Sequence, residues 1–244
     1  MRYIHLTETD STNSWLRDHA PLPPLATVVW ADHQTAGRGC GTNCWESQPG
    51  KNLLFSVLCY PTFIPANRQF LLLEAMALAV KDAIDPMLPP GGTLCIKWPN
   101  DIYWHDSKLG GTLTETSLLG HHVRQSIIGT GLNINQTAFH SDAPNPVSLQ
   151  QITGRSYPLE PLLHAIIGSF SRRLQSLEQG AADSLQTEYG ASLYRRCGFY
   201  PYRDRNGCFD AEIVSVAPDG TLTLRDRSGG LRRYQFKEVA FILN

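Results

Sequence analysis

Apolar residues at helical spacing occupy one long segment, residues 67–84. The segments on both sides of it contain short runs without helical spacing. The broad apolar face of this segment predicts a helix buried against other structure. The runs at 2–6, 27–30 and 52–60 are short and either alternating or apolar, which predicts strands. A repeating βαβ fold would place a helix between most strands. This order therefore favours an α+β fold, in which a mixed sheet is covered on one face by helices.

The remaining segments continue this pattern. Near the start of the chain, the polar residues 10–13 offer side chains that can cap a short helix carrying Trp15 and Leu16. Further strands are predicted at 93–98, 102–104, 111–119 and 125–133, and further helices at 161–179 and 182–193.

The composition changes near residue 197, after which no segment has a helical pattern. Short strands are predicted at 211–217, 221–225 and 231–236, separated by glycine-containing turns at 218–220 and 228–230. The spacing indicates a small β-barrel of about 45 residues, a size that favours packing against a larger partner over independent folding. We therefore expect a larger domain over residues 1–196 and a small barrel over residues 197–244.

The charge balance argues against a surface that binds nucleic acid. The 244 residues carry a formal net charge of -1, and 42% of them are hydrophobic.

No stretch approaches the roughly 20 apolar residues of a membrane span, and the first residues are too polar for a signal peptide. The six cysteines form no Cys-x-x-Cys pair, which favours reduced thiols. We expect a cytoplasmic protein that binds neither membrane nor nucleic acid.

A glycine-rich loop follows the predicted strand at 27–30. Gly37 and Gly39 flank Arg38, so that backbone N–H groups can approach an oxyanion or a polar ligand beside a fixed charge. An ordinary turn fits as well, because the loop has neither a Walker lysine nor a third Rossmann glycine. Trp45, a few residues further on, suits either the wall of a pocket or the core.

A second cluster lies on a predicted hairpin. Lys97 and Lys108 are two of only five lysines in the chain, and both can neutralise phosphate. Pro99 ends the first strand and is expected to hold Asn100 and Asp101 at a tight turn, where an amide and a carboxylate can orient a phosphate-bound Mg²⁺. A polar hairpin with a surface ion pair is the simpler alternative. The combination of two ammonium groups, a carboxylate and an amide favours function.

A glycine pair accompanies the hairpin, and a third polar segment follows at residues 129–135. Gly110 and Gly111 follow the second lysine of the hairpin and permit a phosphate chain to approach closely. Gly131 and Asn133 come at the end of the strand predicted at 125–133, where they suit a sugar hydroxyl or a turn equally.

Taken in order, these motifs closely resemble the signature of the biotin protein ligases, the biotin–acetyl-CoA-carboxylase ligases. The resemblance runs from residue 4 to the C-terminus, because the last 45 residues resemble the SH3-like domain of that family. It implies a class II synthetase-like catalytic domain. Related lipoate ligases and octanoyltransferases share the fold but lack the Lys-Trp-Pro-Asn-Asp segment. The matching segments are 10–13, 34–39, Trp45, 97–101, 108–111 and 129–133.

The resemblance implies a reaction in two steps. Biotin and MgATP give biotinyl-5′-adenylate and pyrophosphate, and a lysine of a biotin carboxyl carrier domain then takes the biotinyl group. It implies biotin contacts from Ser11, Thr12, Asn13, Gln34, Gly37, Arg38, Gly39, Trp45, Lys108, Gly110 and Gly111. It implies ATP contacts from Arg38, Trp45, Lys97, Asn100, Asp101, Lys108, Gly131 and Asn133, with Asn100 and Asp101 near Mg²⁺. The catalytic residues would be Lys108, Lys97, Asp101 and Arg38.

Three other functions are compatible with parts of this pattern: a lipoate or octanoate ligase, a biotin-responsive DNA-binding regulator, and a biotin-binding module without ligase activity. The motif begins at Asp10, so we expect no DNA-binding module of roughly 60 residues before it. One departure is notable, because Cys40 and Asn43 stand where members of the family commonly carry basic residues. We expect the loop 35–44 to order over the adenylate.

Overall fold

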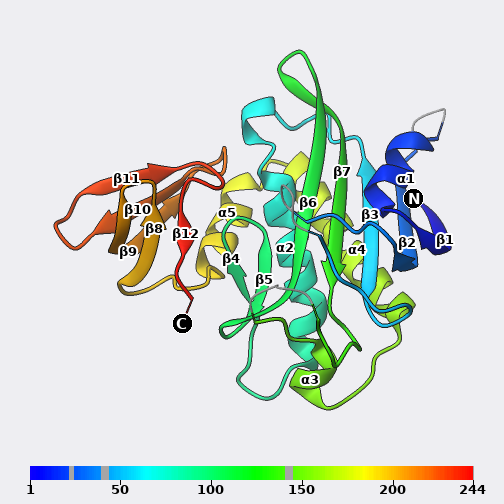
Figure 1. The fold of residues 1–244 in the computed structure, drawn as a ribbon. Helices are drawn as coiled ribbons and strands as arrows, with labels where there is room; N and C mark the ends of the chain where they lie inside the picture. Colours follow the sequence, from blue (N-terminus) through cyan, green and yellow to red (C-terminus); the bar gives the residue numbers. More distant parts are fainter. Residues whose placement is uncertain (22–24, 40–43, 141–144, 244) are drawn as a thin grey trace.

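Two sheets and a set of helices make up the protein (Figure 1). The structure is a computed structural model that describes residues 1–21, 25–39, 44–140 and 145–243. The larger sheet has seven strands in the order β1-β2-β3-β7-β6-β5-β4. β1 and β2 are parallel and the other neighbours are antiparallel, so the mixed sheet of the expected α+β fold is confirmed.

The strands of the larger sheet follow the predicted order, with shifted ends. β2 continues to Gln34, beyond the predicted strand at 27–30, so the glycine-rich loop follows it directly. The strands are β1 (Arg2–Thr9), β2 (Thr27–Gln34), β3 (Leu53–Cys59), β4 (Cys95–Lys97), β5 (Asp101–Trp104), β6 (Ser107–Leu119) and β7 (His122–Leu132).

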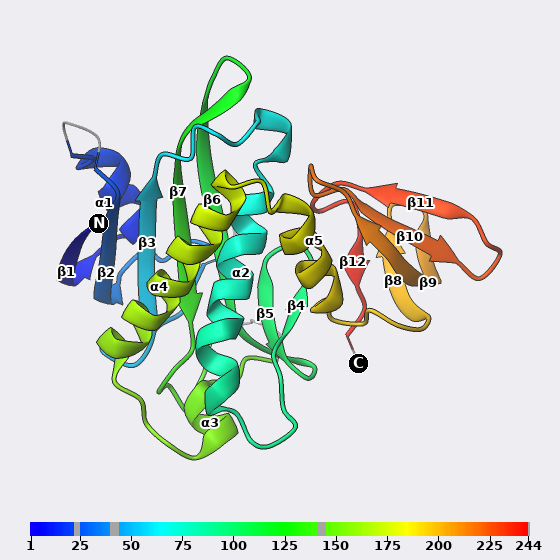
Figure 2. The same cartoon turned by 180° about the vertical axis from the view of Figure 1, so that it is seen from behind.

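Two long helices, α2 (Leu71–Ile84) and α4 (Leu159–Glu178), lie across one face of this sheet (Figure 2). Most side chains of α2 are buried because this helix is enclosed by the sheet on one side and by α4 and α5 (Ala182–Ala191) on the other. The predicted helix at 67–84 begins later, since a 3₁₀ turn (Ala66–Arg68) precedes it. The remaining short helices are η2 (Asp85–Met87) and α3 (Leu149–Thr153).

The opposite face of the sheet carries the short helix α1 (Thr12–Asp18). Its Leu16 packs against Val29, Leu58 and Ile127, which form a small apolar cluster separate from the main core. Successive side chains of a strand point to opposite faces, so residues on either side of these three face the helices α2 and α4 instead. The part of this face that α1 leaves uncovered is available for a ligand.

The C-terminal part forms a five-stranded antiparallel sheet in the order β11-β10-β9-β8-β12. Its buried residues belong to the same apolar cluster as those of α2 and α4, so it packs against the rest of the chain. The Trp98 indole N–H donates to the Gly220 carbonyl across this contact at 2.9 Å. The strands are β8 (Tyr200–Asp204), β9 (Gly207–Val216), β10 (Leu222–Asp226), β11 (Leu231–Tyr234) and β12 (Ala240–Phe241).

Sequence patterns did not predict β8, β12 or α3. Pro201 interrupts the pattern of β8, and β12 has only two residues. Within the described ranges, every helix is too short or too polar to cross a membrane.

Candidate active site

A cleft of about 800 Å³ opens beside the uncovered face of the larger sheet. Its walls come from the start of α1, the glycines of β6 and β7, the turn between β4 and β5, and residues 236–243 of the C-terminal sheet. This volume lies within the range of small-molecule sites.

Most of the residues predicted for the site line this cleft. Gly37 does not, because the position of its missing side chain faces the backbone of Trp45. Gly110 does not either, because it packs against Leu132 and the Gly131 carbonyl. The predicted residues that line the cleft are Ser11, Thr12, Asn13, Gln34, Arg38, Gly39, Trp45, Lys97, Asn100, Asp101, Lys108, Gly111, Gly131 and Asn133.

A group of hydrogen-bonded polar side chains, here called the polar patch, forms one end of the cleft. It consists of Thr12, Asn13, Gln34 and Ser56. The Ser56 hydroxyl donates to Asn13 Oδ1 at 2.6 Å, and the Thr12 hydroxyl lies 2.7 Å from Ser56 Oγ and 3.0 Å from Gln34 Oε1. These side chains come from three elements, and their mutual bonds fix donors and acceptors in place before a ligand arrives.

The start of α1 differs from the prediction that its own polar residues cap it. Ser11 is the N-cap residue, but its side chain makes no capping hydrogen bond. The Thr12 N–H instead donates to Gln34 Oε1 at 2.8 Å. Gln34 therefore supplies from β2 an acceptor for one of the N–H groups that the first turn of a helix leaves unpaired, and this bond ties the helix to the polar patch.

Two lysines and an aspartate form the charged centre of the cleft. Lys108 Nζ lies 2.7 Å from Asp101 Oδ1, and Lys97 Nζ lies 3.7 Å from Asp101 Oδ2. The three side chains are between 18% and 25% exposed. Burial lowers the pKa of Lys97, and the charge of Asp101 offsets part of that effect while Lys108 adds to it. A phosphate entering the cleft would meet two ammonium groups balanced by a single carboxylate.

The turn between β4 and β5 differs in detail from the expected apex. Asp101 is the first residue of β5 and pairs with Lys97 across the hairpin. The Asn100 side-chain amide donates to the Thr112 carbonyl, and the Asn100 carbonyl accepts from the Thr112 N–H at 3.0 Å. Asn100 thus fastens the turn to β6.

These residues do not form a ready-made magnesium site. Both carboxylate oxygens of Asp101 face ammonium groups, and the Asn100 amide is bonded to backbone. Among the described residues, no group of three or more His, Cys, Asp or Glu side chains is placed to hold a metal ion. Magnesium is usually held by one or two carboxylates together with waters and substrate phosphates, so the phosphate-bound Mg²⁺ expected beside Asn100 and Asp101 stays a prediction.

Glycines form the floor of the cleft because neighbouring side chains occupy the space a methyl group would take. A Cβ on Gly129 would lie 2.2 Å from Asn13 Oδ1, and one on Gly131 would lie 2.7 Å from the Trp45 ring. The Trp45 indole N–H is buried and has no hydrogen-bond partner. The Trp45 ring therefore lies against Gly131 of β7, and its N–H is an unused donor at the wall of the cleft.

The loop at 37–45 closes on itself through the Trp45 N–H, which donates to the Gly37 carbonyl at 2.9 Å. Arg38 Nη1 lies 3.1 Å from Glu115 Oε1, and Glu115 also accepts from Asn13 Nδ2 at 3.2 Å. Glu115 thus connects the loop to the polar patch. Cys40 and Asn43, and with them the expected ordering of the loop, lie outside the described residues.

Residues 236–243, here called the C-terminal wall, close the other side of the cleft and were not predicted. Phe236 packs edge-on against Trp98 with ring centres 6.4 Å apart, and the Phe241 ring lies 5.1 Å from Lys97 Nζ. The wall consists of Phe236, Lys237, Val239, Ala240, Phe241 and Leu243. No local pattern marks these residues, because their role depends on packing between the two sheets.

The chain is similar to known proteins in both sequence and structure. The model of the biotin/lipoate A/B protein ligase family matches residues 3–133, which is more than half of the chain.

The chain belongs to the biotin/lipoate A/B protein ligase family.

Relatives agree with this assignment. The bifunctional ligase/repressor BirA of Bacillus spizizenii is 30% identical over 84% of this chain, which spans 63% of that relative. The biotin–[acetyl-CoA-carboxylase] ligase of Paracoccus denitrificans is 32% identical over 68% of this chain and 70% of its own length. The structure of the biotin protein ligase of Aquifex aeolicus with biotin and ATP covers 100% of this chain and 99% of its own, with a TM-score of 0.83 and 23% identity.

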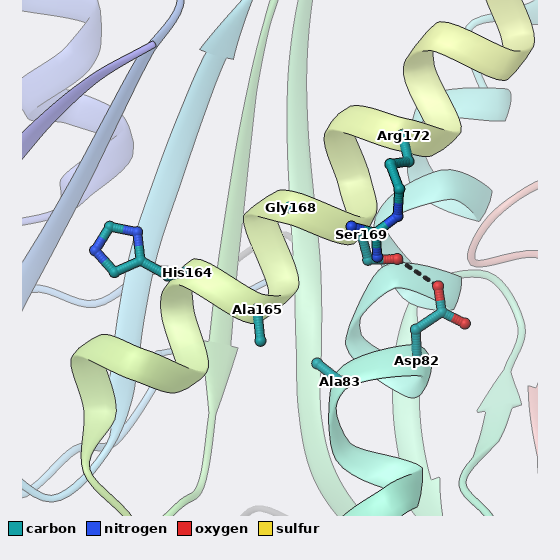
Figure 3. A pocket seen from close by; sticks show the side chains of 7 residues that line it. All are labelled: Asp82, Ala83, His164, Ala165, Gly168, Ser169 and Arg172. Atoms are coloured by element: carbon teal, nitrogen blue, oxygen red, sulfur yellow. Dashed lines mark hydrogen bonds between the residues drawn. The ribbon is translucent and has the colours of Figure 1, made fainter.

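A second, smaller pocket of about 300 Å³ lies between α2 and α4 in this ligase-family chain (Figure 3). Its Asp82 carboxylate is bonded to Ser169 and, at 2.8 Å, to Arg173. Figure 3 shows His164 pointing away from this carboxylate. The hydrogen-bonding capacity of the Asp82 carboxylate is therefore already used within the protein.

Proposed function

We propose that this protein is an ATP-dependent biotin–protein ligase, which makes biotinyl-5′-adenylate and transfers the biotinyl group to a lysine of a carrier protein. One observation carries the proposal: the Lys97–Asp101–Lys108 group and three members of the polar patch, Thr12, Asn13 and Gln34, line the same cleft. Membership of the family, the name of the Paracoccus relative and the biotin and ATP in the Aquifex structure support it.

The first step joins two anions, so it requires positive charge. The biotin carboxylate attacks the α-phosphorus of ATP, a C–O–P linkage forms, and the bond to the β-phosphate oxygen breaks to release pyrophosphate. Lys108 and Lys97 neutralise charge on the phosphates at this stage, and Arg38 adds a third positive group. The ammonium groups are held in place by Asp101, which limits their reorganisation during the reaction.

The second step transfers the acyl group. The amine of the acceptor lysine attacks the carbonyl carbon of the adenylate, an amide bond forms, and AMP leaves. The acceptor must lose a proton to become nucleophilic, and Asp101 is the carboxylate among the described lining residues that can assist this loss.

The two ends of the cleft suit the two halves of the adenylate. The polar patch presents the acceptors and hydroxyls that a ureido ring needs, with Ser11 and Trp45 beside it. Asn133, Gly131 and the lysines suit the nucleotide half. Magnesium would accompany ATP, but the residues present do not fit it as a resident metal, and the proposed steps use none.

Three finer features belong to the same proposal. The C-terminal sheet acts as an SH3-like domain over residues 197–244, joined to a catalytic domain over residues 1–196. The acceptor is a biotin carboxyl carrier domain, as the name of the Paracoccus relative suggests. The reaction takes place in the cytoplasm, where ATP is available.

Biotin-dependent exchange of labelled pyrophosphate into ATP tests the proposal. The ligase should catalyse exchange with biotin, and an excess of lipoate or octanoate should not compete. Exchange supported by lipoate or octanoate and not by biotin would assign the protein to another branch of the family. Biotin binding without any exchange would make it a binding module.

A further inference from the structure

Lys237 occupies an unusual position in the C-terminal wall. It lines the cleft, and its backbone φ is +72°. The Glu238 N–H donates to the Gln235 carbonyl at 3.1 Å, which closes a turn with Lys237 at the third position. Glycine adopts a positive φ of this size without strain, whereas residues with a side chain are strained there. The turn therefore holds a lysine where the backbone alone favours glycine.

Packing on both sides of Lys237 fixes this turn. Phe236 lies against Trp98, and Val239 is buried with 7% of its surface exposed. Phe241, further along the wall, lies over the Lys97 ammonium. The neighbours of Lys237 are thus anchored beside the charged centre of the cleft, while Lys237 itself is exposed.

The Lys237 ammonium has no acidic partner among the described residues. Lys237 Nζ lies over the ring of Phe236, 6.0 Å from the ring centre. The carboxylate next to it in sequence, Glu238, accepts the N–H of Gln235 at 2.7 Å. The turn therefore leaves the lysine charge unpaired.

The other cations of the cleft are already paired. Lys97 and Lys108 share Asp101, and Arg38 is bound by Glu115 at 3.1 Å. In residues 35–45 of the sequence, Arg38 is the only basic residue. Within the described part of the cleft lining, Lys237 is the one cation whose charge is uncompensated.

We propose that Lys237 is a phosphate-binding residue of the nucleotide site, a role that rests on the ligase function proposed above. A lysine ammonium is a compact charge that can approach phosphate oxygens closely. The triphosphate of ATP carries more negative charge than the Lys97–Asp101–Lys108 group can balance. Lys237 supplies the missing charge from the opposite wall, and this ligand contact accounts for a lysine at a strained turn position.

Isothermal titration of the full chain with ATP and with adenosine tests the role of Lys237. Lys237→Ala and Lys237→Gly should each weaken ATP binding about tenfold, the loss expected for one charge-assisted hydrogen bond. Adenosine binding should be unchanged.

Lys237→Gly should also raise the unfolding temperature relative to Lys237→Ala, since glycine relieves the strain. Lys237→Arg should restore most of the ATP affinity. Arg233→Ala, which removes an exposed cation of β11 outside the cleft, is the matched control and should bind ATP like the wild type.

Equal ATP affinity in the wild type and Lys237→Ala would overturn this role, and so would an equal loss of adenosine affinity, which would indicate structural damage. A wild type that binds ATP but shows no biotin-dependent exchange would overturn the ligase function, while the ATP affinities would still decide the role of Lys237. A wild type that binds no ATP would overturn both.

Discussion

Glu74 is a buried acidic residue of α2 whose ionisation should make the stability of the protein depend on pH. The residue is 1% exposed, and neither carboxylate oxygen has a hydrogen-bond partner. Burial raises the pKa of Glu74 from about 4.5 to about 8, although the charge of Arg68 lowers it in part. The folded protein therefore keeps a proton on Glu74 at neutral pH, whereas the unfolded chain has lost it.

This difference determines the direction and size of the effect. Because the folded-state pKa is the higher one, the stability linked to Glu74 is fully present below about pH 4.5 and is lost as the pH rises through 8. At about 1.4 kcal/mol per unit of pKa difference, the loss between pH 5 and pH 8 amounts to ~3.5 kcal/mol. Glu74→Gln removes the titration and keeps the shape of the side chain, so it should match the wild type near pH 5 and be more stable near pH 8.

Urea unfolding, followed by tryptophan fluorescence at several values between pH 5 and pH 8, measures this difference. Glu178→Gln makes the same chemical change at an exposed position of α4, and its stability relative to the wild type should vary little with pH. A constant gap between Glu74→Gln and the wild type across this range would refute the reasoning. It would show that Glu74 is ionised in the folded protein and is stabilised there by Arg68.

Three further substitutions test the cleft. Lys108→Ala should lower the rate of pyrophosphate exchange by about 10²-fold or more, with a much smaller change in biotin affinity, because one preorganised charge is lost from the transition state. Asp101→Asn should move the alkaline limit of exchange activity to lower pH, because Asp101 partly offsets the lowering of the Lys97 pKa. Gly131→Ala should weaken biotin and ATP binding about tenfold in a titration, because a methyl group there would collide with the Trp45 ring.

These tests have outcomes that would count against the assigned roles. Near wild-type exchange in Lys108→Ala would show that Lys108 does not neutralise phosphate charge in the first step. An increased magnesium requirement in Asp101→Asn, with an unchanged pH profile, would favour a metal-ligand role for the carboxylate. Gly190→Ala, in α5 where a Cβ meets nothing within 4 Å, is the control for Gly131→Ala and should leave ligand binding intact.

Local patterns in the sequence predicted the elements and the charged centre well. The helix at 67–84 and the strands around it follow from apolar periodicity, which burial enforces directly. Lys97, Asp101 and Lys108 are found together because they belong to one hairpin and its return strand, so their spacing in sequence nearly determines their spacing in the fold.

Contacts between distant segments could not be predicted in the same way. The bond from Trp98 to Gly220 joins residues 122 positions apart, and neither residue shows in its own neighbourhood that it meets the other. The bond from the Thr12 N–H to Gln34 is unpredictable for the same reason, because residues 10–13 themselves carry polar side chains that could cap the helix. Glu115 looks like an ordinary strand residue until the fold brings Arg38 and Asn13 to it.

Because the cleft is divided between two sheets, its two parts can evolve separately. The polar patch lies within residues 3–133, which match the family model, whereas the C-terminal wall lies outside that match. Mutations that change the ligand contacts of the polar patch therefore need not alter those of the C-terminal wall. A recombination event that brought in a different C-terminal sheet would replace one set of contacts to the bound molecule and leave the other set inherited intact.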